Sequence, residues 1–163
     1  MLENYRRYPI GIQNFEQLRN HHCVYVDKTE LIYRLTHTDS VYFFSRPRRF
    51  GKSLLLSTLK AYFEGKRDLF KGLKIESLEK EWHKHPMFHI DFNGVNFTEA
   101  GALKRELEGR IIGWEKEYGI VPEVDFNLAS RFEKVVQAAS ERYGRRAVVL
   151  VDEYDKPWGH RLI

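Results

Sequence analysis

The sequence has few cysteines and prolines, and it has no long apolar run. Its single cysteine, Cys23, excludes an internal disulfide. A membrane-spanning helix would need about 18 or more consecutive apolar residues, and no such stretch occurs. The first residues contain no apolar core of a secretory signal. We therefore expect a cytoplasmic protein that does not enter a membrane.

The positive net charge invites a nucleic-acid hypothesis, but the excess is local. The formal net charge is only +4 over 163 residues, whose length suits one domain and whose 42% hydrophobic content suits a folded core. Arg46, Arg48, Arg49 and Lys52 lie in one short loop, and without them basic and acidic residues balance. A local excess of this kind suits a compact polyphosphate better than an extended DNA backbone.

The loop follows a run of β-branched and aromatic residues at 41–45, which predicts a buried central strand. It leads into Gly51-Lys52-Ser53 and then into a leucine-rich helix, predicted from about Lys52 to Glu64 with Gly65 at its end. Strand, loop, Gly-Lys-Ser and helix form the layout of a phosphate-binding P-loop. The full P-loop motif has glycine at the position of Arg46. From Gly-Lys-Ser alone, a P-loop and an ordinary strand–turn–helix are therefore equally plausible.

Each residue of the tripeptide has a type that phosphate binding requires. Gly51 lets the backbone approach phosphate oxygens without a Cβ in the way. Lys52 can reach the β- and γ-phosphates, and the Ser53 hydroxyl can ligate Mg²⁺. The first N–H groups of the helix favour an anion. The predicted ATP-binding residues are Arg46, Pro47, Arg48, Arg49, Phe50, Gly51, Lys52, Ser53 and Leu54.

The remaining chain alternates predicted helices with short predicted strands, which favours an α/β fold with a mostly parallel sheet. Further strands are expected at 24–26, 87–92 and 147–151. Short helices are expected after Asn14, after Asp27 or Thr29, and near 77–83. Two longer helices are expected from Thr98 to Gly119, with a core stripe that includes Trp114, and from Asn127 to Gly144.

The last predicted strand runs through four aliphatic residues into Asp152 and Glu153, which is typical of a Walker B motif. Asp152 can hold the Mg²⁺ that bridges the β- and γ-phosphates. Glu153 can orient or deprotonate the attacking water. Buried strands often end in acidic residues, but the combination with an upstream P-loop predicts a nucleotide site in which Lys52 and Glu153 are catalytic.

Four segments, taken together, resemble a bacterial family of predicted AAA-ATPase-like proteins. They are 9–12 (Pro-Ile-Gly-Ile), 25–29 (Tyr-Val-Asp-Lys-Thr), 46–54 and 151–157. Arg46 is what this family carries in its P-loop. The resemblance implies an ASCE-type P-loop NTPase, a three-layer sandwich with a mostly parallel sheet, ATP and Mg²⁺ as cofactors, and often a C-terminal nuclease-like domain of the PD-(D/E)XK type.

The sequence departs from this family because it stops shortly after Glu153. The family's strand order, 5-1-4-3-2, places a fourth strand between Walker B and the P-loop strand, and that strand supplies a sensor residue. We expect a partial AAA-ATPase-like domain over 1–163, incomplete at its C-terminus, with an N-terminal segment (1–40) and a P-loop core (41–163). We therefore expect weak or absent ATP turnover by this chain alone.

Three functions from different classes stay open. The first is an Mg²⁺-dependent ATPase domain that regulates or powers an effector, and the second is a catalytically silent nucleotide-binding module. The third is a nucleic-acid-binding fragment that uses the loop arginines. The expected partners are a nucleotide, DNA through a C-terminal domain outside this chain, and further copies of the protein.

Other candidate sites are weaker. His83, His85 and His89 favour structural or surface roles over metal binding, because they do not share one helix face and no carboxylate–histidine motif accompanies them. The His21-His22-Cys23 segment is also a weak metal candidate, because it lacks a distant pair of ligands. Asp91 is favoured as a strand-end cap over a site residue, although parallel strands gather ligands at their carboxyl ends.

Overall fold

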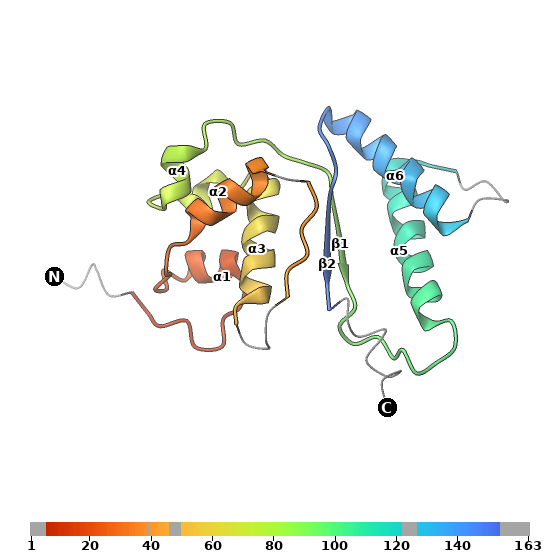
Figure 1. Cartoon of the computed structure of the whole chain (residues 1–163), viewed down its shortest axis with the longest axis horizontal. Helices are drawn as coiled ribbons and strands as arrows, with labels where there is room; N and C mark the ends of the chain where they lie inside the picture. Colours follow the sequence, from red (N-terminus) through yellow and green to blue (C-terminus); the bar gives the residue numbers. More distant parts are fainter. Residues whose placement is uncertain (1–5, 39, 46–49, 122–126, 154–163) are drawn as a thin grey trace. The chain divides into compact units, whose positions relative to one another are not determined.

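The computed structural model describes residues 6–38, 40–45, 50–121 and 127–153. The chain divides into two compact units, Met1–Lys84 and His85–Ile163 (Figure 1), and each is described by itself. The described part of the first unit is helical. Its elements are α1 (Phe15–Asn20), α2 (Thr29–Thr38), α3 (Lys52–Phe63), the 3₁₀ helix η1 (Arg67–Phe70) and α4 (Lys74–Leu78).

The first unit has an aromatic core. Phe15 and Phe70 are fully buried, and their ring centroids lie 4.9 Å apart. Trp82 packs on Phe70 at the same centroid distance of 4.9 Å. Helix α3 contacts α1, and α2 contacts α4. Helix α3 is therefore held by the N-terminal segment of the chain.

Local caps set most helix boundaries as predicted. Asn14 accepts a hydrogen bond from the Gln17 N–H at 3.0 Å and caps α1. Asp27 accepts from the Thr29 N–H at 2.9 Å and from the Lys74 N–H at 2.7 Å, so it caps α2 and also fixes the start of α4. The buried Thr29 hydroxyl accepts from the Ile75 N–H at 3.1 Å. The Asp-Lys-Thr segment thus has a structural role that joins two helices.

The second unit contains β1 (Met87–Asp91), α5 (Ala102–Tyr118), α6 (Leu128–Tyr143) and β2 (Val148–Asp152). The two strands pair in parallel, with Met87 opposite Val148 and Asp91 opposite Asp152. Helices α5 and α6 lie on one face of this sheet (Figure 1). The fully buried Phe88 of β1 packs against Trp114 of α5 at a 5.0 Å ring-centroid distance, which confirms the predicted core stripe.

Helix α6 begins and ends at its predicted residues. The Asn127 side chain accepts from the Ser130 N–H at 3.0 Å, and Gly144 ends the helix with a φ of 61°. Helix α5 ends at Gly119 as predicted, but the predicted start at Thr98 is wrong. Gly101, with a φ of 76°, is the N-cap, and the Thr98 hydroxyl donates to the Asn96 side chain at 2.7 Å.

Two predicted strands are absent from the described residues. Residues 41–45 belong to no strand there, and Val41 and Phe43 are 86% and 75% exposed. Residues 24–26 are also irregular, and only an isolated bridge joins Arg7 to Cys23 next to them. β-branched and aromatic residues give a segment the propensity to form a strand, but a strand forms only where a neighbouring segment supplies backbone hydrogen-bond partners. The short helix expected near 77–83 lies earlier, at α4.

Over the ranges that the structure describes, no helix has both the length and the apolar character needed to cross a membrane.

Candidate functional site

The candidate phosphate loop ends in a left-handed glycine. Gly51 has a φ of 77° and is the N-cap of α3, with no side-chain cap bond. Its carbonyl accepts the first helical hydrogen bond from the Leu55 N–H at 2.9 Å. A Cβ at Gly51 would meet nothing within 4 Å, so the backbone conformation, rather than crowding, requires glycine here. The loop therefore turns sharply into the positive end of a helix.

The helix starts where the sequence predicts it. Lys52 and Ser53 lie in the first turn of α3, beside Leu54, and Phe50 before them is 63% exposed. This is the placement that a P-loop lysine and a Mg²⁺-ligating hydroxyl need. The predicted phosphate contacts of Arg46, Pro47, Arg48 and Arg49 lie outside the described residues.

Helix α3 is anchored just after these residues. Ser57 accepts a hydrogen bond from the Phe15 N–H at 3.0 Å, which ties α1 to the second turn of α3. The buried Thr58 donates to the Leu54 carbonyl at 2.7 Å. At the other end Gly65, with a φ of 70°, and Lys66 donate to the Tyr62 and Ala61 carbonyls and close the helix. These anchors fix the direction in which the start of α3 points.

The candidate Walker B residues lie at the carboxyl end of the parallel sheet. Asp152 is the last residue of β2 and lies opposite Asp91, the last residue of β1. The Asp152 carboxylate accepts from the Glu153 N–H at 2.8 Å. Glu153 has a φ of 54°, a left-handed conformation that is uncommon outside glycine. The chain therefore turns sharply at Glu153 as it leaves the sheet.

Asp91 fits both of the roles that the sequence left open. Its carboxylate accepts from the Asn93 N–H at 2.8 Å, so it caps its own strand end as favoured. Its register with Asp152 also places it in the group of acidic residues at this sheet edge. Arg110 of α5 donates to the Asp91 carbonyl at 2.7 Å and to the His89 carbonyl at 3.2 Å, which fixes the end of β1.

The oxygen ligands present suit Mg²⁺. The Ser53 hydroxyl in the first unit and the Asp152 carboxylate in the second unit are each a hard oxygen donor. Mg²⁺ keeps several waters and commonly uses one or two carboxylates plus substrate phosphates, so a complete cage of protein ligands is not needed. In the described ranges no three His, Cys, Asp or Glu side chains gather into a metal-binding group. His83 pairs instead with Glu81 at 2.8 Å.

The structure therefore groups the predicted site residues into two local sets. Gly51, Lys52 and Ser53 start α3 in the first unit. Asp152 and Glu153 end β2 in the second unit, with Asp91 beside them. Sequence reasoning missed the anchors of these sets, and Ser57 in particular. Its only sequence signal is a hydroxyl on the helix that follows the P-loop.

Comparison with known proteins places this geometry in a family. A family model described as "Predicted AAA-ATPase" matches residues 9–162. The chain belongs to this predicted AAA-ATPase family. Membership implies nucleotide binding.

A curated relative of this AAA-ATPase chain is an uncharacterized protein in the vnfD 5′ region of Azotobacter chroococcum mcd 1. The two are 40% identical over 153 residues, which is 93% of this chain. The chain spans 30% of the length of that relative. No solved structure matches the chain.

Proposed function

We propose that this chain binds Mg·ATP at the loop that ends in Gly51, Lys52 and Ser53. The observation that carries the proposal is the left-handed glycine at the N-cap of α3, in a chain that belongs to a predicted ATPase family. The helix dipole and the Lys52 ammonium favour the triphosphate at that position. The proposed binding residues also include Phe50 and, outside the described residues, Arg46, Pro47, Arg48 and Arg49. The proposed fold is an ASCE-type three-layer sandwich.

We further propose that the intact protein hydrolyses ATP. Phosphoryl transfer depends on positioning and on neutralising the charge that develops on the phosphoryl oxygens. Lys52 would hold the β- and γ-phosphates. Ser53 and Asp152 would hold Mg²⁺, which neutralises phosphate charge when it is bound. Glu153 would accept a proton from the attacking water or orient it.

The biological output would be regulation or powering of an effector domain outside this chain. The support is the family resemblance, in which a nuclease-like domain often follows the ATPase core. The relative is also much longer than the match, since the chain spans 30% of its length. DNA would then be a partner of the effector and not of the loop arginines.

A titration with Mg·ATP tests the binding site. Lys52→Ala should weaken ATP binding at least about tenfold, because a charge-assisted phosphate contact is lost. Lys60→Ala is the matched control, since Lys60 lies on the same helix and makes only a 3.9 Å pair with Glu64. If Lys52→Ala binds ATP as tightly as Lys60→Ala does, the P-loop assignment is wrong.

A second candidate function is nucleotide binding without turnover. It is favoured by the local engagement of the Asp152 carboxylate with the Glu153 N–H at 2.8 Å. Phosphate release separates the two functions. If the chain hydrolyses ATP, Glu153→Gln should stop phosphate release and keep ATP binding. If the chain is a silent module, neither the parent chain nor Glu153→Gln should release phosphate. DNA binding that falls steeply with salt and survives saturating ATP would favour the nucleic-acid alternative instead.

A further inference from the structure

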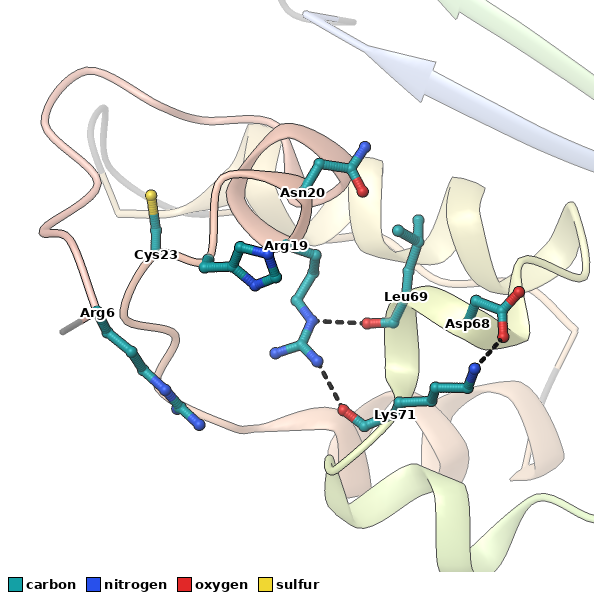
Figure 2. Close-up of a pocket in the computed structure, with 8 residues that line it drawn as sticks. Arg6, Arg19, Asn20, Cys23, Asp68, Leu69 and Lys71 are labelled. Atoms are coloured by element: carbon teal, nitrogen blue, oxygen red, sulfur yellow. Dashed lines mark hydrogen bonds and ion pairs between the residues drawn. The ribbon is translucent and has the colours of Figure 1, made fainter. Parts of the chain in front are cut away.

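The first unit contains a basic cavity that the proposed ATP site does not use. It has a volume of about 390 Å³ and is lined by residues of α1, the turn after it and the loop at η1 (Figure 2). This size falls at the lower end of small-molecule sites in proteins. The polar lining residues that matter are Arg6, Arg19, Asn20, His22 and Lys71.

Arg19 is held rigidly in this cavity. Its Nε donates to the Leu69 carbonyl at 2.7 Å and its Nη2 donates to the Lys71 carbonyl at 2.6 Å. Both bonds lie on one side of the guanidinium, and Nη1 is on the side that faces Arg6 in Figure 2. A guanidinium fixed in this way loses little side-chain entropy when it binds an anion.

Backbone hydrogen bonds fix the opposite wall. The turn after α1 places His22 at a φ of 51°, and Cys23 donates to the Leu18 carbonyl at 3.0 Å. Arg7 forms an isolated parallel bridge with Cys23, and the Val24 N–H donates to the Arg7 carbonyl at 2.8 Å. The backbone next to Arg6 is therefore held beside this turn, and the exposed Arg6 side chain lines the cavity across from η1 (Figure 2).

The charge of the lining residues favours a dianion. Arg6, Arg19 and Lys71 are cationic, and Asp68 is the one acidic residue among those that line the cavity. The Asp68 carboxylate is engaged by Lys71 Nζ at 2.7 Å. With His22 neutral, the lining carries a formal excess of two positive charges, which matches a phosphate monoester of about −1.5 to −2 better than a monocarboxylate. Leu69 and Cys23 complete the lining.

We propose that this cavity binds the phosphate group of a small phosphorylated metabolite, as a second anion site separate from the P-loop. The ligand's phosphate would lie between the fixed guanidinium of Arg19 and the side chain of Arg6. The proposal is independent of ATP binding, because none of its residues belongs to the phosphate loop or to the acidic sheet edge.

The experiment uses the whole chain with Lys52→Ala, so that the P-loop contributes little phosphate binding. Inorganic phosphate and glycerol 3-phosphate are titrated at constant ionic strength while backbone amide shifts are followed by NMR. We expect saturable shifts at Asn20, Cys23 and Lys71, with tighter binding of glycerol 3-phosphate. Arg6→Gln should weaken binding at least about fivefold, since Arg6 supplies a charge-assisted contact.

Arg34→Gln is the matched control, because it removes an equal charge from an exposed position of α2 outside the cavity. It should bind both probes as the parent does. The proposal is overturned if sodium chloride produces the same shifts, if Arg6→Gln and Arg34→Gln bind equally, or if glycerol 3-phosphate binds no more tightly than phosphate. An oligonucleotide that binds more tightly than glycerol 3-phosphate through Arg6 would also overturn it.

Discussion

Asp91 and Asp152 lie opposite each other in register, as the last residues of two parallel strands. Both carboxylates are half-buried, and each accepts a backbone N–H of the turn that follows its strand, at 2.8 Å in both cases. Two carboxylates at one sheet edge repel each other unless a cation lies nearby. This relationship supports the proposed role of Asp152 as a Mg²⁺ ligand.

Asp152→Asn should therefore raise the Mg²⁺ concentration needed for ATP binding by at least about tenfold, since a direct carboxylate ligand is lost. Asp91→Asn should have a smaller effect, because Asp91 has no proposed direct ligand bond. Titration of Mg²⁺ at fixed ATP measures both. Equal midpoints for Asp152→Asn and the parent chain would remove Asp152 from the metal site.

Much of the local structure was predictable because its causes lie within a few residues. Asn14 and Asn127 cap the helices that follow them, and Gly144 ends α6. The strand pair 87–91 and 148–152 also follows from composition and from the helices between the two strands. The family resemblance was carried by short motifs of the same local kind.

Features that depend on distant partners were not predictable. The segment 41–45 has the composition of a central strand, yet composition cannot supply its ladder partner. Nothing near Arg19 in the sequence indicates its bonds to the Leu69 and Lys71 carbonyls, which lie about fifty residues away along the chain. The carboxyl-end rule did place Asp91 at the sheet edge, because parallel register is a general property of the fold.

Glu115 and Arg131 form a buried ion pair that should control the stability of the second unit. Arg131 Nε and Nη2 donate to the two Glu115 oxygens at 2.7 and 2.6 Å, and Glu115 is 2% exposed. Glu115→Ala removes both of these short bonds and leaves the guanidinium with the more exposed Glu108 carboxylate at 3.6 Å. We therefore expect a loss of up to about 3–5 kcal/mol in the free energy of unfolding. Urea denaturation measures this.

The exposed pair of Glu99 and Arg105, at 3.0 Å, is the matched control for that ion pair. Glu99→Ala should change the free energy of unfolding by no more than about 1 kcal/mol, because water screens exposed pairs. Similar losses for Glu99→Ala and Glu115→Ala would contradict the structural role of the buried pair.

Asp27 should make the first unit sensitive to acid. Burial opposes its ionisation, but the hydrogen bonds from Thr29 and from the Lys74 N–H outweigh burial and hold the pKa of the Asp27 carboxyl below its usual value. Its contribution to stability is thus complete above the unfolded pKa of about 3.9, and it is lost as pH falls through the lower folded pKa. Asp27→Ala should cost about 0.5–2 kcal/mol per lost cap at neutral pH.

The difference between Asp27→Ala and the parent should then shrink as pH falls below about 4. Urea denaturation at several pH values from neutral to acid measures it. Glu30→Ala is the matched control, since it removes a carboxylate from the same first turn of α2 that makes only a 3.6 Å exposed pair. A Glu30→Ala chain with the same change in pH dependence would assign the effect to general charge instead of to Asp27.

Substitutions at Gly51 and Gly113 distinguish the effect of backbone conformation from the effect of the space available for a side chain. A Cβ would meet nothing within 4 Å at either position, but only Gly51 has a positive φ, of 77°. Gly51→Ala should therefore destabilise the chain by about 1–2 kcal/mol, the cost of a left-handed L-residue. Gly113→Ala, inside α5, should stabilise it by about 0.5–1 kcal/mol because alanine favours the helix. We expect the two substitutions to shift the urea midpoint in opposite directions, and we expect only Gly51→Ala to weaken ATP binding. Shifts of the same sign would contradict the conformational role of Gly51.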